Sequence, residues 1–329
     1  MKYFTEPNGK FLIKIPSEWQ YKNKFYREEE KSPFGFEPYE NPIGAFQMSI
    51  YPNEKEKAKQ AKEIQKYDTE NLNFEKSRMD GEGFNMHIWS CFVEDNLFFA
   101  KYIYYTNKAK DNRIIEELKK VERSLATLMI LSESKGKEAL IIDKYEKFIA
   151  ALAASFDLKE KAMKGKSMIE FVIIIANQID AYLRLSIVMA KQLKDMSDEI
   201  DISYLFQGEN DPPVMERKIY KIAQEMNIID DEIYYKLEKL YKDRNKIVHR
   251  YIISEITTID LMDSVVDYEE ICESVRLKLE VIEDLQVVKK VGIYKNGTPA
   301  NSELSDETLK MIYAQINDKH SLDDLYRKI

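Results

Sequence analysis

Residues 168–193, MIEFVIIIANQIDAYLRLSIVMAKQL, form the most hydrophobic segment of this chain. Ser167 precedes the segment as a candidate N-cap, and apolar side chains surround most of the predicted helix. Because such a helix must be buried on two sides, we expect it to lie inside a helical bundle and to reach a dimer interface. Its longest unbroken apolar run, 171–176, is far shorter than the roughly 20 residues of a membrane-spanning helix. The segment therefore predicts an all-α core and no membrane span.

Four polar residues interrupt this helix along one face. Glu170, Asn177 and Arg184 recur every seven residues, and Asp180 lies beside them. One interpretation is a stripe that faces solvent. The other is that Asn177 or Asp180 faces a neighbouring helix that carries reactive side chains and orients them.

Further helical patterns flank this core helix. They predict helices over 138–163, 214–226, 230–250 and 260–285, with Asp230 and Asp231 as candidate caps. The last of these helices, 260–285, completes a predicted up-and-down four-helix bundle over residues 137–290. The remaining tail, 291–329, carries a short helix from Ser305, and its apolar residues are candidates for tying two domains together.

Residues 244–251, at the end of the helix predicted over 230–250, read RNKIVHRY. Arginine binds phosphate through a rigid, permanently charged fork, and histidine exchanges protons near neutral pH. Arg244 and His249 are therefore sufficient to cut RNA without a metal, by activating the ribose 2′-hydroxyl and stabilising the charge that builds on phosphorus. The structural alternative is a helix in which these side chains only form caps or ion pairs.

The positions of these residues on the helix also carry information. Arg244 and Tyr251 fall on its apolar stripe, where a guanidinium is costly unless a partner or a phosphate meets it. Asn245 precedes His249 by four residues, so its amide is a candidate to orient the imidazole. Arg244 and His249 lie about 140° apart around the helix axis, so one helix does not easily aim both at one phosphate. Two copies packed face to face can direct an arginine and a histidine at the same phosphate, and we therefore predict a homodimer.

The pattern Arg-x4-His-x-Tyr resembles the signature of the HEPN superfamily, and in this fuller form the toxin of MNT–HEPN toxin–antitoxin systems. The resemblance implies a dimeric, metal-independent endoribonuclease that leaves 2′,3′-cyclic phosphate ends. It implies catalysis by Arg244 and His249, and Asn245 also fits the commonest family pattern. Tyr251 matches the tyrosine that an antitoxin blocks by nucleotidylation, although a structural role for it is also open.

Charge is distributed unevenly along the chain. The formal net charge is −8, which disfavours indiscriminate coating of nucleic acid. Between Lys236 and Arg250, however, six basic residues face two acidic ones, an excess of four positive charges. Lys242, Lys246 and Arg250 are therefore candidate RNA-binding residues. The other interpretation is that these cations only complement the dipole at the end of the helix.

The first 132 residues are predicted to be an α+β sandwich, an antiparallel sheet with two helices. Strands are expected over 10–19, 21–27, 45–51, 84–94 and 97–106, a loop over 32–44, helices over 54–72 and 114–128, and a tight turn at 95–96. Trp19, Trp89 and His87 are expected to be structural. The opening FLIKIPSEW at 11–19, followed by this order of strands and helices, resembles Mog1/PsbP-like domains. For this domain we expect a recognition or regulatory role.

Composition excludes several classes of protein. Cys91 and Cys272 stand far apart and the three histidines are scattered, so no disulfide framework, metal site or cofactor is expected. The N-terminus lacks an apolar signal core, which predicts a soluble cytoplasmic protein.

Three functions remain open at this point. The first is a metal-independent endoribonuclease acting as a toxin or defence effector, with RNA as its substrate. The second is an inactive HEPN-type adaptor that binds nucleotides or proteins. The third is a toxin restrained by a neighbouring nucleotidyltransferase that modifies Tyr251.

Overall fold

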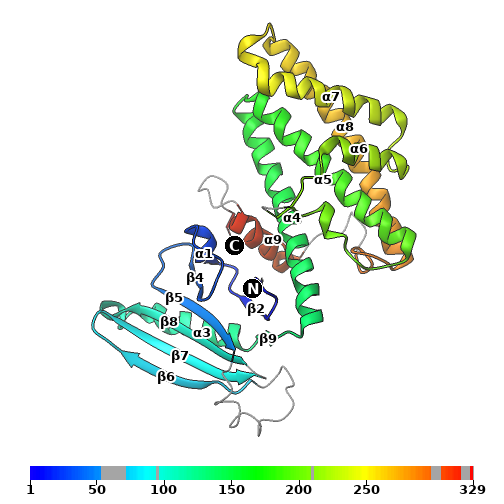
Figure 1. Cartoon of the computed structure of the whole chain (residues 1–329). Coiled ribbons are helices and arrows are strands. Elements are labelled where there is room, and N and C mark those ends of the chain that lie inside the picture. Colours follow the sequence, from blue (N-terminus) through cyan, green and yellow to red (C-terminus); the bar gives the residue numbers. More distant parts are fainter. Residues whose placement is uncertain (53–71, 94–95, 209–210, 298–304, 320–326, 329) are drawn as a thin grey trace. The chain divides into compact units, whose positions relative to one another are not determined.

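The computed structural model describes residues 1–52, 72–93, 96–208, 211–297, 305–319 and 327–328. These residues divide into two compact units. The first unit holds Met1–Asp143 together with the helix α9 (Asp306–Lys319), and the second holds Lys144–Ser305. Figure 1 shows the first unit as mostly sheet and the second as helices.

The first unit contains two antiparallel sheets. The larger has the strand order β3-β4-β5-β8-β7-β6 and the smaller has the order β1-β2-β9 (Figure 1). The helix α3 (Asn112–Leu125) contributes Val121 and Leu125 to the same core as the strands. The strands are β1 Lys2–Thr5, β2 Phe11–Ile15, β3 Trp19–Tyr21, β4 Phe34–Pro38, β5 Gly44–Pro52, β6 Glu75–Asp80, β7 Phe84–Val93, β8 Asn96–Tyr105 and β9 Met129–Ile130.

Alternating apolar residues build the core of this unit. Phe46, Met48 and Ile50 on β5 are buried, as the two-residue period of a strand requires. Trp19 is fully buried and donates from Nε1 to Glu117 Oε2 on α3, at 2.9 Å. The bond satisfies a buried indole and ties the helix to the strand segment, so the structural role expected for Trp19 is what the fold shows.

Several strand predictions for this unit were wrong or incomplete. The stretch 21–27 is not extended beyond Tyr21, because the short helix α1 (Lys22–Phe25) follows it. The predicted loop 32–44 contains β4, and β6 was missed because all six of its side chains are exposed and give no apolar alternation. The helix predicted over 54–72 lies, apart from residue 72, outside the described residues, as does half of the turn at 95–96.

The second unit is helical. Its long helices α4, α5, α7 and α8 alternate in direction along the chain, and α6 packs against α5 and α7 (Figure 1). The helices are α4 Glu133–Lys164, which begins in the first unit, α5 Met168–Asp195, α6 Glu216–Glu225, α7 Asp231–Arg250 and α8 Thr258–Lys289. Contacts between residues fix these directions. Antiparallel packing of α4 and α5 follows from Ser155 with Gln178 and Lys159 with Phe171, and that of α7 and α8 from Leu240 with Tyr268 and Lys236 with Glu270. Parallel packing of α5 and α8 follows from Met189 with Gln286 and Tyr182 with Arg276.

The helix α5 forms the centre of this core. Phe171, Ile175, Ile179 and Leu183 are completely buried, and most of the helix is enclosed by its neighbours. Within the described part of the chain, α5 is the one helix long and apolar enough to cross a membrane, by length and composition alone. Its burial inside the unit is the arrangement of a core helix in a soluble protein.

Helix caps fix where α7 and α8 begin. The Asp230 carboxylate accepts from the backbone N–H of Ile233 at 2.9 Å, so Asp230 is the N-cap of α7 and Asp231 is its first residue. Thr257 and Asp260 form a capping box at the start of α8. Ser167 occupies the N-cap position of α5, but its side chain makes no capping hydrogen bond.

The segment after α8 is anchored to the helical unit by two buried glutamines. Gln286 donates to the Met189 carbonyl oxygen and to Gln192 Oε1, at 3.1 and 2.8 Å. The backbone N–H of Tyr294 donates to Gln286, and that of Ile293 donates to Gln192. Gly292, with φ of +85°, allows the chain to turn directly above this network.

We expect Gly292→Ala to lower the free energy of unfolding of the helical unit by about 2–4 kcal/mol. A Cβ there is strained by the positive φ, collides with Gln286 Nε2 and lies 2.7 Å from Gln192 Oε1. Urea unfolding followed by far-ultraviolet circular dichroism measures the loss. The matched control is Gly83→Ala, since Gly83 has φ of +92° and a Cβ added there would have nothing within 4 Å. A Gly292→Ala loss no larger than that control contradicts the role of the clash.

Candidate active site

Arg244 lies on the inner side of α7 and is held by a carboxylate from α6. Its Nη1 donates to Glu216 Oε2 at 2.6 Å, and both side chains are only 16% exposed. Its guanidinium also lies 4.9 Å from the centre of the Tyr241 ring. The apolar stripe predicted an inward-facing arginine that needs a partner, and Glu216 is that partner.

Glu216 is itself held in place. Its Oε1 accepts from the hydroxyl of Tyr220, one turn later on the same helix. Sequence reasoning missed Glu216, because an acidic residue in the first turn of a helix is ordinary. The signal would have been its one-turn spacing to a buried Tyr220, but nothing in the sequence pairs α6 with Arg244.

The ion pair with Glu216 opposes the effect of burial on the charge of Arg244. Burial alone would lower the pKa of Arg244, but the charge of Glu216 and the hydrogen bond to it outweigh burial and raise that pKa. One of its five N–H groups goes to Glu216, and Nη2 donates to Asn245 Oδ1 at 3.3 Å. Glu216 and Asn245 thus hold the guanidinium in one orientation.

His249 lies on the opposite, solvent side of α7. Its side chain is exposed, and within the described part of the chain the imidazole has no hydrogen-bond partner. Asn245 was expected to orient this imidazole. Its amide oxygen instead accepts from Arg244, so in a single copy Asn245 acts on the guanidinium and His249 is free to meet a substrate.

Asn177 and Asp180 of α5 have different surroundings. Asn177 is exposed, which agrees with the solvent-stripe interpretation for that residue. Asp180 is largely enclosed, and its carboxylate accepts from Arg184 Nε at 2.6 Å. Burial raises the pKa of Asp180, against the effect of Arg184, and the charges of Glu216 and Arg244 also act on it. Asp180 thus borders the Glu216–Arg244 pair.

Arg184 connects α5 to the segment that leads into α6. Its Nη1 and Nη2 donate to the carbonyl oxygens of Tyr204 and Val214, at 3.1 and 2.7 Å. Val214 precedes Glu216 by two residues. The Asp180–Arg184 pair therefore fixes the start of α6 and, through it, the carboxylate that holds Arg244.

The candidate RNA-binding residues are on the surface. Lys242, Lys246 and Arg250 are exposed, and Lys246 approaches Asp243 at 3.6 Å. Tyr251 was expected on the apolar stripe of the helix, but α7 ends at Arg250 and Tyr251 begins the short 3-10 helix η3 (Tyr251–Ile253), 37% exposed. Among the described residues no cluster of His, Cys, Asp or Glu could hold a metal ion.

Comparisons with known proteins do not assign a family. No family model and no curated protein matches the sequence. A solved structure from Bacteroides thetaiotaomicron is similar at 15% identity over 55% of this chain and 76% of that chain, with a TM-score of 0.30. A likeness at this level carries no functional argument.

We expect Glu216→Gln to destabilise the helical unit by about 1–3 kcal/mol, because it leaves a half-buried guanidinium without its counter-charge. Urea unfolding followed by circular dichroism measures this, and a double-mutant cycle with Arg244→Ala gives the coupling energy. Arg217→Ala is the matched control, since Arg217, the next residue on α6, forms a more exposed pair with Glu238 and should contribute less than about 1 kcal/mol. Equal losses for both variants contradict a special role for Glu216.

Proposed function

We propose that the helical unit is a HEPN-like, metal-independent endoribonuclease whose reactive groups are Arg244 and His249. The observation that carries the proposal is that α7 bears a guanidinium held by Glu216 on its inner side and, on its solvent side, an exposed imidazole without a partner among the described residues. Here the arginine is oriented, the histidine is free, and the motif RNKIVHRY supplies both.

The mechanism follows from these two groups. His249 acts as general base on the ribose 2′-hydroxyl and as general acid on the leaving 5′-oxygen. Arg244 neutralises the charge that develops on the phosphorane, with Glu216 and Asn245 holding its guanidinium. The nucleophile comes from the substrate itself, so the products are a 2′,3′-cyclic phosphate and a 5′-hydroxyl.

A homodimer supplies the second set of groups. The end of α7, the connection to α8 and the start of α8 expose a set of apolar side chains close to His249 in the sequence, with Ile252 93% and Ile253 81% exposed. We call these residues the apex patch; they are Val248, Tyr251, Ile252, Ile253, Ile259 and Met262. Exposed aliphatic side chains gathered in one segment mark an interaction surface. A second copy that covers the apex patch brings His249 of both copies together.

A cytoplasmic toxin or defence effector is the role that suits such an enzyme. Tyr251 is exposed beside His249, so a group attached to its hydroxyl by a restraining enzyme would obstruct the same surface. The first unit, which resembles Mog1/PsbP-like domains in its opening sequence, would then recognise a partner or regulate cleavage.

Incubation of the purified protein with labelled total RNA and tRNA in excess chelator tests the proposal. Fragments that end in 2′,3′-cyclic phosphate support it. The alternative is an adaptor that binds RNA, nucleotides or a protein without cutting. Intact RNA together with a retained RNA–protein complex in the same reaction favours the adaptor and overturns the enzyme.

We expect the triple variant Lys242→Ala, Lys246→Ala and Arg250→Ala to weaken RNA binding while the cleavage step of bound RNA stays nearly unchanged. Each lost phosphate contact reduces the slope of log affinity against log salt by about 0.7, so the slope should fall by about 2. Binding titrations at several salt concentrations measure it. Lys221→Ala on α6, an exposed lysine outside the motif, is the control. An unchanged slope in the triple variant means that these cations do not contact RNA.

A further inference from the structure

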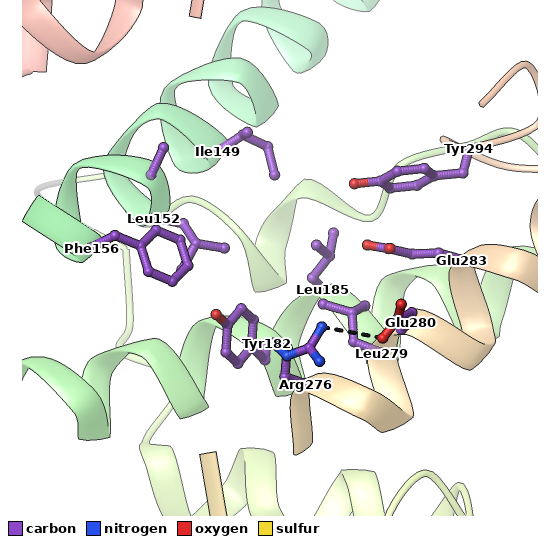
Figure 2. Close-up of a pocket in the computed structure, with 11 residues that line it drawn as sticks. Ile149, Leu152, Phe156, Tyr182, Leu185, Arg276, Leu279, Glu280, Glu283 and Tyr294 are labelled. Carbon is purple, nitrogen blue, oxygen red and sulfur yellow. Dashed lines mark hydrogen bonds and ion pairs between the residues drawn. The ribbon is translucent and has the colours of Figure 1, made fainter. Parts of the chain in front are cut away.

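A cavity of about 260 Å³ opens between α4, α5, α8 and the segment after α8 (Figure 2). All of its lining residues belong to the helical unit. The volume lies just below the roughly 300–1,000 Å³ of ordinary small-molecule sites. It has room for a small ligand, and the proposed ribonuclease chemistry uses none of its residues.

One wall of this cavity is apolar. Leu152 and Phe156 project into it from α4, and Tyr182 and Leu185 form its floor on α5 (Figure 2). The Phe156 ring remains 45% exposed although it lines the cavity. An aromatic or branched aliphatic body would cover these side chains and exclude water from them.

The opposite wall is charged, and its arginine is already neutralised. Arg276 on α8 donates from Nε to Glu273 Oε2 at 2.8 Å and from Nη1 to Glu280 Oε2 at 3.2 Å. The guanidinium is thus shared between two carboxylates. It has little charge left to attract an anionic ligand.

Glu283 adds a further carboxyl group that lacks a cationic partner among the described residues. It lines the cavity with its carboxyl beside the Tyr294 hydroxyl (Figure 2). Within that part of the chain no lysine or arginine forms an ion pair with it. Burial raises the pKa of Glu283, an effect that the Tyr294 hydroxyl opposes. Among the residues that line the cavity, Glu280 and Glu283 face one Arg276, an excess of one negative charge.

We propose that this cavity binds a small organic cation, an amine carried on an aromatic or branched aliphatic body. The body packs against Leu152, Phe156 and Leu185, and the ammonium lies between Glu280 and Glu283. The cation supplies a counter-charge to Glu283. A carboxylate ligand of the same shape meets an excess of negative charge and is disfavoured.

Three probes of one shape test the charge preference on the full-length protein. They are phenylethylamine, the neutral phenylethanol and the anionic phenylpropionate, followed by calorimetry and by the shift in thermal unfolding. We expect saturable binding of the amine, at least about tenfold tighter than that of either other probe. Equal affinities for all three, or no saturable binding of the amine, overturn the proposal.

Two variants place the amine in the cavity. Glu283→Gln should weaken its binding at least about tenfold, because a charge-assisted contact becomes neutral. Ala153→Leu, which adds bulk to the cavity wall on α4, should abolish it. Glu269→Gln, an exposed carboxylate of α8 outside the cavity, is the control and should leave binding unchanged. If the amine binds both cavity variants as it binds the control, the site lies elsewhere and the proposal fails.

Discussion

We expect His249→Ala to reduce RNA cleavage by about 1000-fold, within the range that general acid–base catalysis contributes. The imidazole is the one proton-transfer group of the motif, and without it neither the 2′-hydroxyl nor the leaving oxygen exchanges its proton efficiently. The exposed ring has no hydrogen-bond partner within the described residues, so its removal should change stability by no more than about 0.5 kcal/mol. Single-turnover cleavage of a labelled RNA measures the rate.

The control for this variant separates chemistry from binding. RNA affinity of His249→Ala should stay within about threefold of the wild type, because phosphate contacts come from arginine and lysine. Lys246→Ala, three residues earlier on the same helix, should show the reverse pattern. A His249→Ala protein that cuts as fast as the wild type removes the catalytic assignment.

We expect the double substitution Ile252→Asp and Ile253→Asp to convert a dimer into monomers and to lower cleavage at least about 100-fold. Two charges placed in an apolar interface would each lose their hydration without gaining a partner, which costs several kcal/mol. Both side chains are more than four-fifths exposed in a single copy, so folding of the monomer should not suffer. Sedimentation analysis and cleavage assays on the same samples measure both effects.

Val288→Asp provides the comparison for the apex patch. Val288 is 77% exposed on α8, near the other end of that helix, and carries the same kind of substitution outside the patch. It should leave the oligomeric state and the cleavage rate unchanged. A monomeric wild-type protein, or a dimer that survives the double substitution, contradicts the use of the apex patch.

The helical unit could be read from the sequence because its signals are local. The apolar run of 168–193 and the cap at Asp230 lie at, or within a few residues of, the helix boundaries that they predict. The inward position of Arg244 also followed from the helical period. Its partner Glu216 did not, because that contact joins residues 28 positions apart and depends on how α6 packs against α7.

The failures have equally local causes. Tyr251 was placed on the stripe by extending the helix one residue too far; Arg250, with φ of −130° and ψ of 3°, already leaves the helical conformation. All residues of β6 are exposed, so the strand shows no alternation of apolar and polar residues. The strand β4 lies in a segment whose proline and glycine residues favoured a loop. Exposed edges and helix ends are set by packing rather than by composition.

Mixed dimers test most directly whether the two copies share one reactive site. A complex of one Arg244→Ala copy and one His249→Ala copy, purified with two different affinity tags, retains one guanidinium and one imidazole but no copy with both. We predict that it cleaves RNA at least about tenfold faster than either parental homodimer, since each of those lacks one of the two groups entirely. A mixed dimer as inactive as its parents, beside an active wild-type dimer, would show that each copy works alone and would contradict the shared site.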